Sequence, residues 1–81
     1  MAKPYNGHHC WNCWNVSLWI GNDEGLYRFA LECRRDPVRS TGRKPSLNVA
    51  ATRFLDVVEG KTPDGARYTR QAVKAALAGL E

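Results

Sequence analysis

The sequence lacks a long apolar run. A membrane-spanning helix needs about 18 or more consecutive apolar residues, and no such stretch occurs. Polar and small residues follow Lys3, where a secretory leader would need an apolar core. We therefore expect neither a membrane span nor a signal peptide, and we expect the protein to act in the cytoplasm.

The sequence contains only three cysteines and two histidines. The odd cysteine count fits reduced thiols better than a disulfide framework. His8, His9, Cys10 and Cys13 have the residue types and spacing of zinc ligands, and Cys33 could complete a Cys₃His set. Cys33, however, falls in the apolar stripe of an expected helix, where it is explained as a buried thiol. We therefore expect no metal and no cofactor.

Catalytic motifs are also missing. The 81 residues fit one domain, residues 1–81, with a single small core and little room for an internal substrate cavity. No glycine-rich phosphate loop and no paired-carboxylate constellation occurs. A cysteine nucleophile would depend on His8 or His9 as base, and both lie in residues 1–10, which we expect to be an irregular N-terminal arm. The sequence predicts no catalytic residue and a non-enzymatic function.

The positive charge is concentrated in one segment. The chain has 12 Lys and Arg against 8 Asp and Glu, a net charge of +4. Residues 34–45, here called the basic loop, read RRDPVRSTGRKP and predict an exposed, flexible connection. Such a loop fits contact with phosphate or with an acidic protein surface; a loop that only keeps the protein soluble is the plainer alternative. Its cations are Arg34, Arg35, Arg39, Arg43 and Lys44.

The apolar spacing predicts an all-α domain of about four helices. One helix of about four turns is expected from residue 46, with Gly60 after its last apolar turn. Residues 61–65 are expected to form a turn before the last helix. A further helix is expected to run to about Arg35 and to end before Pro37. The expected N-cap residues of the three helices are Asn22 or Asp23, Ser46 and Thr69.

Residues 11–20 are ambiguous. Apolar residues alternate with Asn15 and Ser17 as in a half-buried strand, but the chain offers no second strand as a partner. The alternating apolar residues are Trp14, Val16, Leu18 and Ile20. We therefore expect a helix that is apolar nearly all round, and such a helix is either central in the core or presents a surface to a partner. We expect Trp14 to lie in the core, with a cost of about 3–5 kcal/mol on truncation to alanine.

Two blocks of the chain carry a family resemblance. The first is Tyr-Asn-Gly-His at residues 5–8 followed by WNVSLWIGNDEGLY at residues 14–27, and the second is Thr-Pro-Asp-Gly at residues 62–65. The sequence resembles a family of small uncharacterised proteins of phages, plasmids and integrative elements, with a YNGH…WNVxLWIxNDEGLY signature. The resemblance covers residues 5–35 strongly and 62–80 weakly. It supplies no catalytic residue, leaves the basic loop outside, and disfavours a metal at Cys10 and Cys13, where the family usually has other residues.

Together these features lead us to expect a non-enzymatic accessory protein of a phage or mobile element. Its expected partner is a host protein complex in the host cytoplasm, and the expected effect is inhibition of a defence system, as by an anti-CRISPR or anti-restriction protein. The alternative is a small nucleic-acid-binding protein that acts through the basic loop. Because Arg and Trp dominate interface energetics, the expected contacts are the five cations of the basic loop with Trp11 and Trp19.

Overall fold

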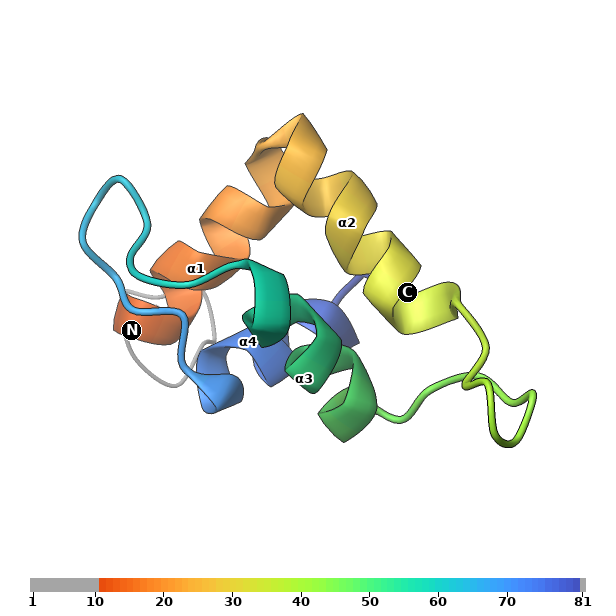
Figure 1. Ribbon diagram of the computed structural model, residues 1–81. Helices are drawn as coiled ribbons and strands as arrows, with labels where there is room; N and C mark the ends of the chain where they lie inside the picture. The colour runs from red at the N-terminus through yellow and green to blue at the C-terminus, as the bar shows by residue number, and fades with distance from the viewer. Residues whose placement is uncertain (1–10, 81) are drawn as a thin grey trace, which may run out of the picture.

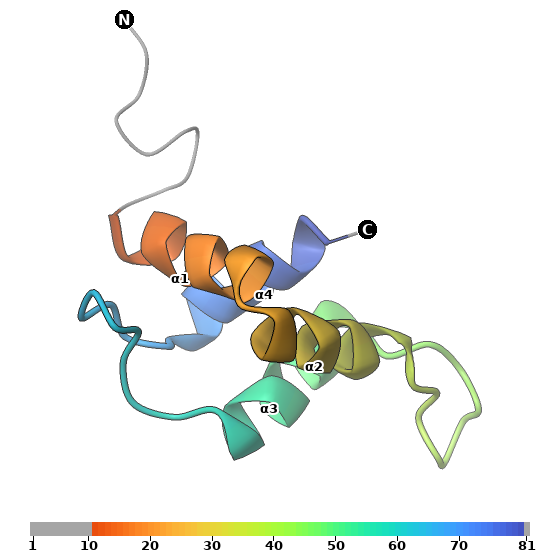
Figure 2. The ribbon, with the colours of Figure 1, turned by 90° about the horizontal axis from the view of Figure 1, so that it is seen from above.

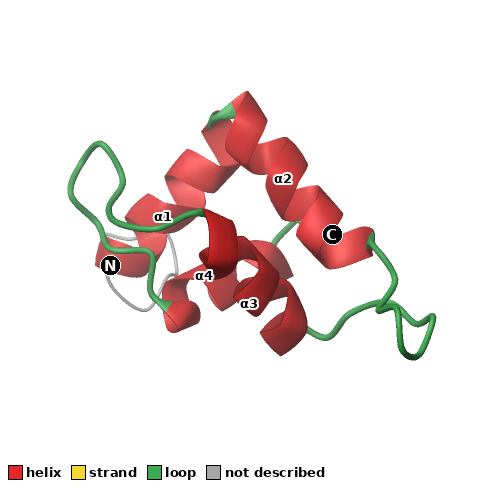
Figure 3. Cartoon of the chain, in the orientation of Figure 1, coloured by secondary structure: helices red, strands yellow, loops and turns green. Residues whose placement is uncertain are grey.

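The computed structural model describes residues 11–80, which form a helical bundle (Figure 1). Over this range no strand forms (Figure 3), which confirms the all-α prediction. Among residues 11–80, none of the helices has both the length and the apolar composition that a membrane span requires. The predicted N-terminal arm, with His8, His9 and Cys10, lies outside the described residues. The helices are α1 (Trp11–Asn22), α2 (Glu24–Arg35), α3 (Leu47–Val57) and α4 (Arg70–Ala78).

Three of the helices begin at the predicted caps. The side chain of Asp23 accepts from the Leu26 N–H at 2.9 Å, so Asp23 rather than Asn22 caps α2. Ser46 and Thr69 cap α3 and α4 in the same way, at 3.2 and 3.1 Å. The helix α3 is 11 residues long, about three turns and not the expected four.

The core lies where α1 and α2 pack against α3 and α4 (Figures 1 and 2). Phe54 of α3 is fully buried, and its ring lies 5.6 Å from the ring of Phe29 and 6.0 Å from that of Tyr68. Alanines fill much of the remaining core and allow the helices to approach closely. The buried apolar residues are Cys13, Val16, Ile20, Ala30, Cys33, Ala50, Ala51, Phe54, Ala66, Ala72, Val73, Ala76 and Leu77.

The helix α1 meets this core through its aliphatic residues and not through Trp14. Val16 and Ile20 are fully buried. Trp14 is only half-buried, and its neighbours on the same face, Trp11 and Leu18, are 40% and 37% exposed. The prediction that Trp14 belongs to the core is wrong. The sequence alone could not show which face of α1 is buried, because α1 carries large apolar residues on opposite faces.

Candidate functional site

A polar stripe of α1 holds the loop that connects α3 to α4. Asn12, Asn15 and Trp19 follow one another at spacings of three and four, so they share one face of the helix. The side-chain amide of Asn12 donates to the carbonyl of Arg67 at 2.8 Å and accepts the N–H of Arg67 at 2.7 Å. Asn12 therefore satisfies both backbone groups of Arg67, much as a neighbouring strand would.

The centre of the contact is Asn15, whose side chain is 1% exposed. The hydroxyl of Thr62 donates to Asn15 Oδ1 at 2.6 Å and accepts the Ala66 N–H at 3.1 Å. Asn15 Nδ2 donates to Asp64 Oδ2 at 2.9 Å. These bonds satisfy the buried amide and the buried hydroxyl, which would otherwise be costly.

Trp19 completes this contact. Its indole Nε1–H donates to the same Asp64 oxygen at 2.9 Å, so two donors converge on one carboxylate atom. The hydrogen bonds from Asn15 and then Trp19 lower the pKa of Asp64 below its ordinary value, against a smaller opposing effect of desolvation. Asp64 is thus an anionic anchor of the loop. We call Asn12, Asn15, Trp19, Thr62, Asp64 and Arg67 the α1–loop clasp.

The α1–loop clasp joins the two sequence blocks that carry the family resemblance. Its side-chain bonds connect residues 45 to 55 positions apart. A tight turn presents Asp64: the Gly65 N–H donates to the carbonyl of Thr62 at 2.9 Å, and Gly65 has a φ of 95° that suits glycine. Trp19 was expected to contact a partner; in the structure it is half-buried and its indole N–H is bonded to Asp64.

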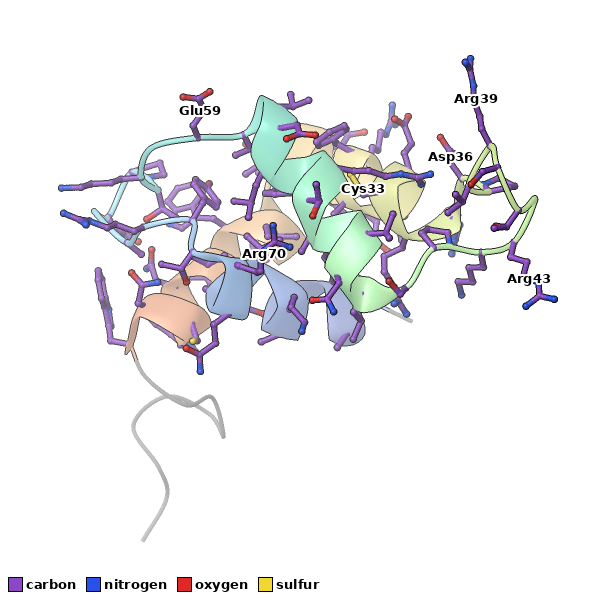
Figure 4. The ribbon with its side chains drawn as sticks, turned by 60° about the horizontal axis from the view of Figure 1, so that its bottom comes forward. Cys33, Asp36, Arg39, Arg43, Glu59 and Arg70 are labelled. Atoms are coloured by element: carbon purple, nitrogen blue, oxygen red, sulfur yellow. The ribbon has the colours of Figure 1, made fainter. Side chains whose placement is uncertain are left out.

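The basic loop is a closed turn and not a loose connection. The Val38 N–H donates to the carbonyl of Arg43 at 2.8 Å, and the Gly42 N–H donates to the carbonyl of Val38 at 2.6 Å. Gly42 has a φ of 67°, which favours glycine. Arg39 and Arg43 are exposed, and their side chains project from different sides of the loop, with Asp36 on the side of Arg39 (Figure 4).

Arg53 of α3 ties the start of the basic loop to the bundle. Its guanidinium donates to the carbonyls of Cys33, Asp36 and Pro37, at 3.3, 2.7 and 3.4 Å. These carbonyls lie at the C-terminal end of α2, where a cation is favourable. The bonds fix the direction in which the basic loop leaves α2.

A groove of about 520 Å³ lies beside the start of the basic loop, between α2 and α3. Its apolar lining includes the half-buried Phe29 and Val57, which is 66% exposed. Three exposed carboxylates, those of Glu32, Asp36 and Asp56, line it together with Arg39 and Arg53. We call it the α2–α3 groove; its surface mixes charges of both signs.

The structure does not gather the predicted partner-binding residues into one patch. Arg35, Arg39, Arg43 and Lys44 are exposed at the end of α2 and in the loop, whereas Arg34 is half-buried and its Nε has no hydrogen-bond partner among the described residues. Trp11 stands at the start of α1, at the opposite end of the molecule from the basic loop (Figures 1 and 2).

The described cysteines are core residues. Cys13 and Cys33 are each 3% exposed. Burial raises the pKa of Cys33 to about 11, although the charge of Arg53 acts in the opposite direction. At neutral pH Cys33 is therefore a protonated thiol, which is a poor nucleophile and a poor metal ligand. Within residues 11–80, no three His, Cys, Asp or Glu side chains are placed to hold a metal ion.

Comparison with known proteins places the chain in a family. No curated protein and no solved structure matches it. A family model matches residues 1–78, and this range includes both blocks joined by the α1–loop clasp and also the basic loop. The chain therefore belongs to the matched family, a family of unknown function (DUF7249).

Proposed function

We propose that the chain is a non-enzymatic binding protein that contacts a partner protein through the basic loop and the α2–α3 groove. The observation that carries this proposal is the mixture of charges there, with Glu32, Asp36 and Asp56 beside Arg39. A nucleic acid backbone offers only negative charge, so these carboxylates would oppose its approach. A protein surface offers both signs, and protein interfaces pair them.

The local geometry supports the same proposal. The turn between Val38 and Arg43 and the bonds from Arg53 hold the basic loop in place, so less conformational freedom is lost when a partner binds. Val57 and Phe29 add apolar surface next to Arg39. Arginine beside apolar contact area is typical of the residues that dominate protein interfaces.

The finer part of the proposal names the partner and the effect. The partner is a host protein complex in the cytoplasm, and the effect is inhibition of a defence system by steric blocking. This part rests on the resemblance to proteins of phages and mobile elements and on the small size of the chain, 81 residues, which favours surface recognition over chemistry.

Two charge-reversal variants test the proposal. Arg39→Glu/Arg43→Glu alters the basic loop, and Lys61→Glu/Arg67→Glu alters two exposed cations of the α3–α4 connection. Each variant replaces two cations by two anions, so both lower the formal net charge from +4 to 0. Affinity capture from a host lysate, with quantitative mass spectrometry, should recover one stoichiometric complex with the wild type and with the control variant, but not with the basic-loop variant. Phage plating in strains with defined defence systems should give the same pattern. The wild type and the control variant should protect the phage, and the basic-loop variant should not.

The nucleic-acid alternative has its own measurement. If the five cations of the basic loop engaged duplex phosphates, the logarithm of the binding constant should fall against the logarithm of salt concentration with a slope of about −4 to −5. Fluorescence anisotropy with a labelled duplex provides this slope. A complex with that slope, together with no retained protein and unchanged plating, would replace the proposed function by the alternative.

A further inference from the structure

The solvent side of α2 carries charges of alternating sign. Leu26, Ala30 and Cys33 turn toward the core, and α2 forms an edge of the bundle (Figure 1). On the opposite side all residues are exposed except Leu31, which is half-buried. We call this side the α2 outer face; in chain order it consists of Glu24, Tyr27, Arg28, Leu31, Glu32 and Arg35.

The order of these charges is self-complementary. Read from Glu24 to Arg35 the signs are minus, plus, minus, plus, and read backwards they are plus, minus, plus, minus. A second α2 laid antiparallel therefore places its Glu32 opposite Arg28 and its Arg35 opposite Glu24. The midpoint between positions 28 and 32 and the midpoint between positions 24 and 35 differ by only half a residue, about 0.75 Å along the helix, so a single register forms both kinds of ion pair.

We infer that the α2 outer face is a self-association surface, on which a second copy of this chain docks its own α2 antiparallel about a two-fold axis. The two-fold axis makes each pair occur twice, as in an isologous dimer. Residues on the same flank of antiparallel helices meet, and Arg28 and Glu32 lie on the same flank of α2. The contact is thus built from four interhelical ion pairs.

Apolar residues at the centre favour this contact over a merely solvated helix face. Tyr27, which is 38% exposed, and Leu31 lie between the outermost charges, where the second helix would cover them. The ion pair from Arg28 to Glu24 within α2, at 2.6 Å, joins side chains that are 74% and 77% exposed. Such an exposed pair contributes little to stability, so these side chains exchange partners readily.

Charge swaps test the inference. Arg28→Glu leaves two acids at positions 28 and 32, and Glu32→Arg leaves two bases there. In a dimer of either variant, like charges at positions 28 and 32 face each other across the contact. The dissociation constant of that dimer should therefore rise about tenfold or more at low salt. An equimolar mixture of the two variants restores opposite charges at every contact, as does the double variant Arg28→Glu/Glu32→Arg. Sedimentation velocity should show salt-sensitive dimers for the wild type, the mixture and the double variant, and monomers for each single variant, with circular dichroism to verify folding.

Several outcomes would overturn the inference. The inference fails if the wild type stays monomeric at low salt and high concentration. It also fails if the single variants associate as the wild type does, or if the equimolar mixture does not associate. A monomeric wild type whose captured complex is lost on Arg28→Glu would assign the α2 outer face to another protein. Glu32 also lines the α2–α3 groove, so capture is compared only for Arg28→Glu and for Arg39→Glu/Arg43→Glu, whose residues each belong to one of the two surfaces; the two ideas then fail separately.

Discussion

Replacement of Asn15 by alanine is expected to destabilise the protein by about 2–4 kcal/mol. Loss of its side-chain oxygen leaves the hydroxyl of Thr62, in a residue only 4% exposed, without its acceptor at 2.6 Å. A buried polar group that loses its partner costs about 1–3 kcal/mol, and the space left by the amide adds about 1 kcal/mol. A domain of 81 residues has a total stability of roughly 4–12 kcal/mol, so the change should be large.

Urea unfolding followed by tryptophan fluorescence measures this cost. Asn48→Ala is the matched control, because Asn48 is exposed in the first turn of α3 and its carbonyl, rather than its side chain, accepts from Thr52 and Arg70. The control should stay within about 0.5 kcal/mol of the wild type. If Asn15→Ala also stayed within that range, the reasoning from the buried hydrogen bonds would be refuted.

Three further predictions follow from burial and from the pKa shifts. Phe54→Ala should cost about 3–5 kcal/mol in the same urea assay, and Trp14→Ala clearly less, because only Phe54 is fully buried; equal costs would contradict the described core. The folded state lowers the pKa of Asp64, so the stability contributed by its anion is present above the ordinary value of 3.8 and is lost as the pH falls through the lower, folded value. Asp64→Asn should therefore be less stable than the wild type at pH 7, and this difference should shrink as the pH falls below 3.8; a constant difference would argue against this linkage. Cys33 should react with iodoacetamide at pH 8 far more slowly in the folded than in the urea-unfolded protein, as peptide mapping would show; equal rates would mean that the thiol is accessible.

The sequence predicted the helices well because their signals are local. Ser46 and Thr69 cap through bonds to backbone N–H groups three residues away, and such bonds need no knowledge of the rest of the fold. The inward face of α1 was predicted wrongly for the opposite reason. Both of its faces are apolar, and the choice between Trp14 and Val16 is made by the surfaces of α2 and α4.

The candidate surfaces were predicted only in part. The exposure of Arg39 and Arg43 followed from composition. Closure of the basic loop rests on backbone bonds between Val38, Gly42 and Arg43, which composition alone does not specify. The bonds from Arg53 join α3 to the end of α2, so no local pattern in the sequence predicted them. The α1–loop clasp was missed because its polar residues are far apart in the chain, although the spacing of Asn12, Asn15 and Trp19 on one face of α1 was a signal that could have been used.

The bond between Trp19 and Asp64 fixes the α3–α4 connection on α1, and a pH titration of the indole N–H signals by ¹⁵N-HSQC tests it most directly. Trp11 and Trp14 serve as internal controls, since the side chains that donate to Asp64 are those of Asn15 and Trp19. The Trp19 signal should move as Asp64 takes up its proton, with a midpoint below the ordinary pKa of 3.8, and Asp64→Asn should abolish the movement. A Trp19 signal that stays still with those of Trp11 and Trp14 while the protein remains folded would contradict the α1–loop clasp.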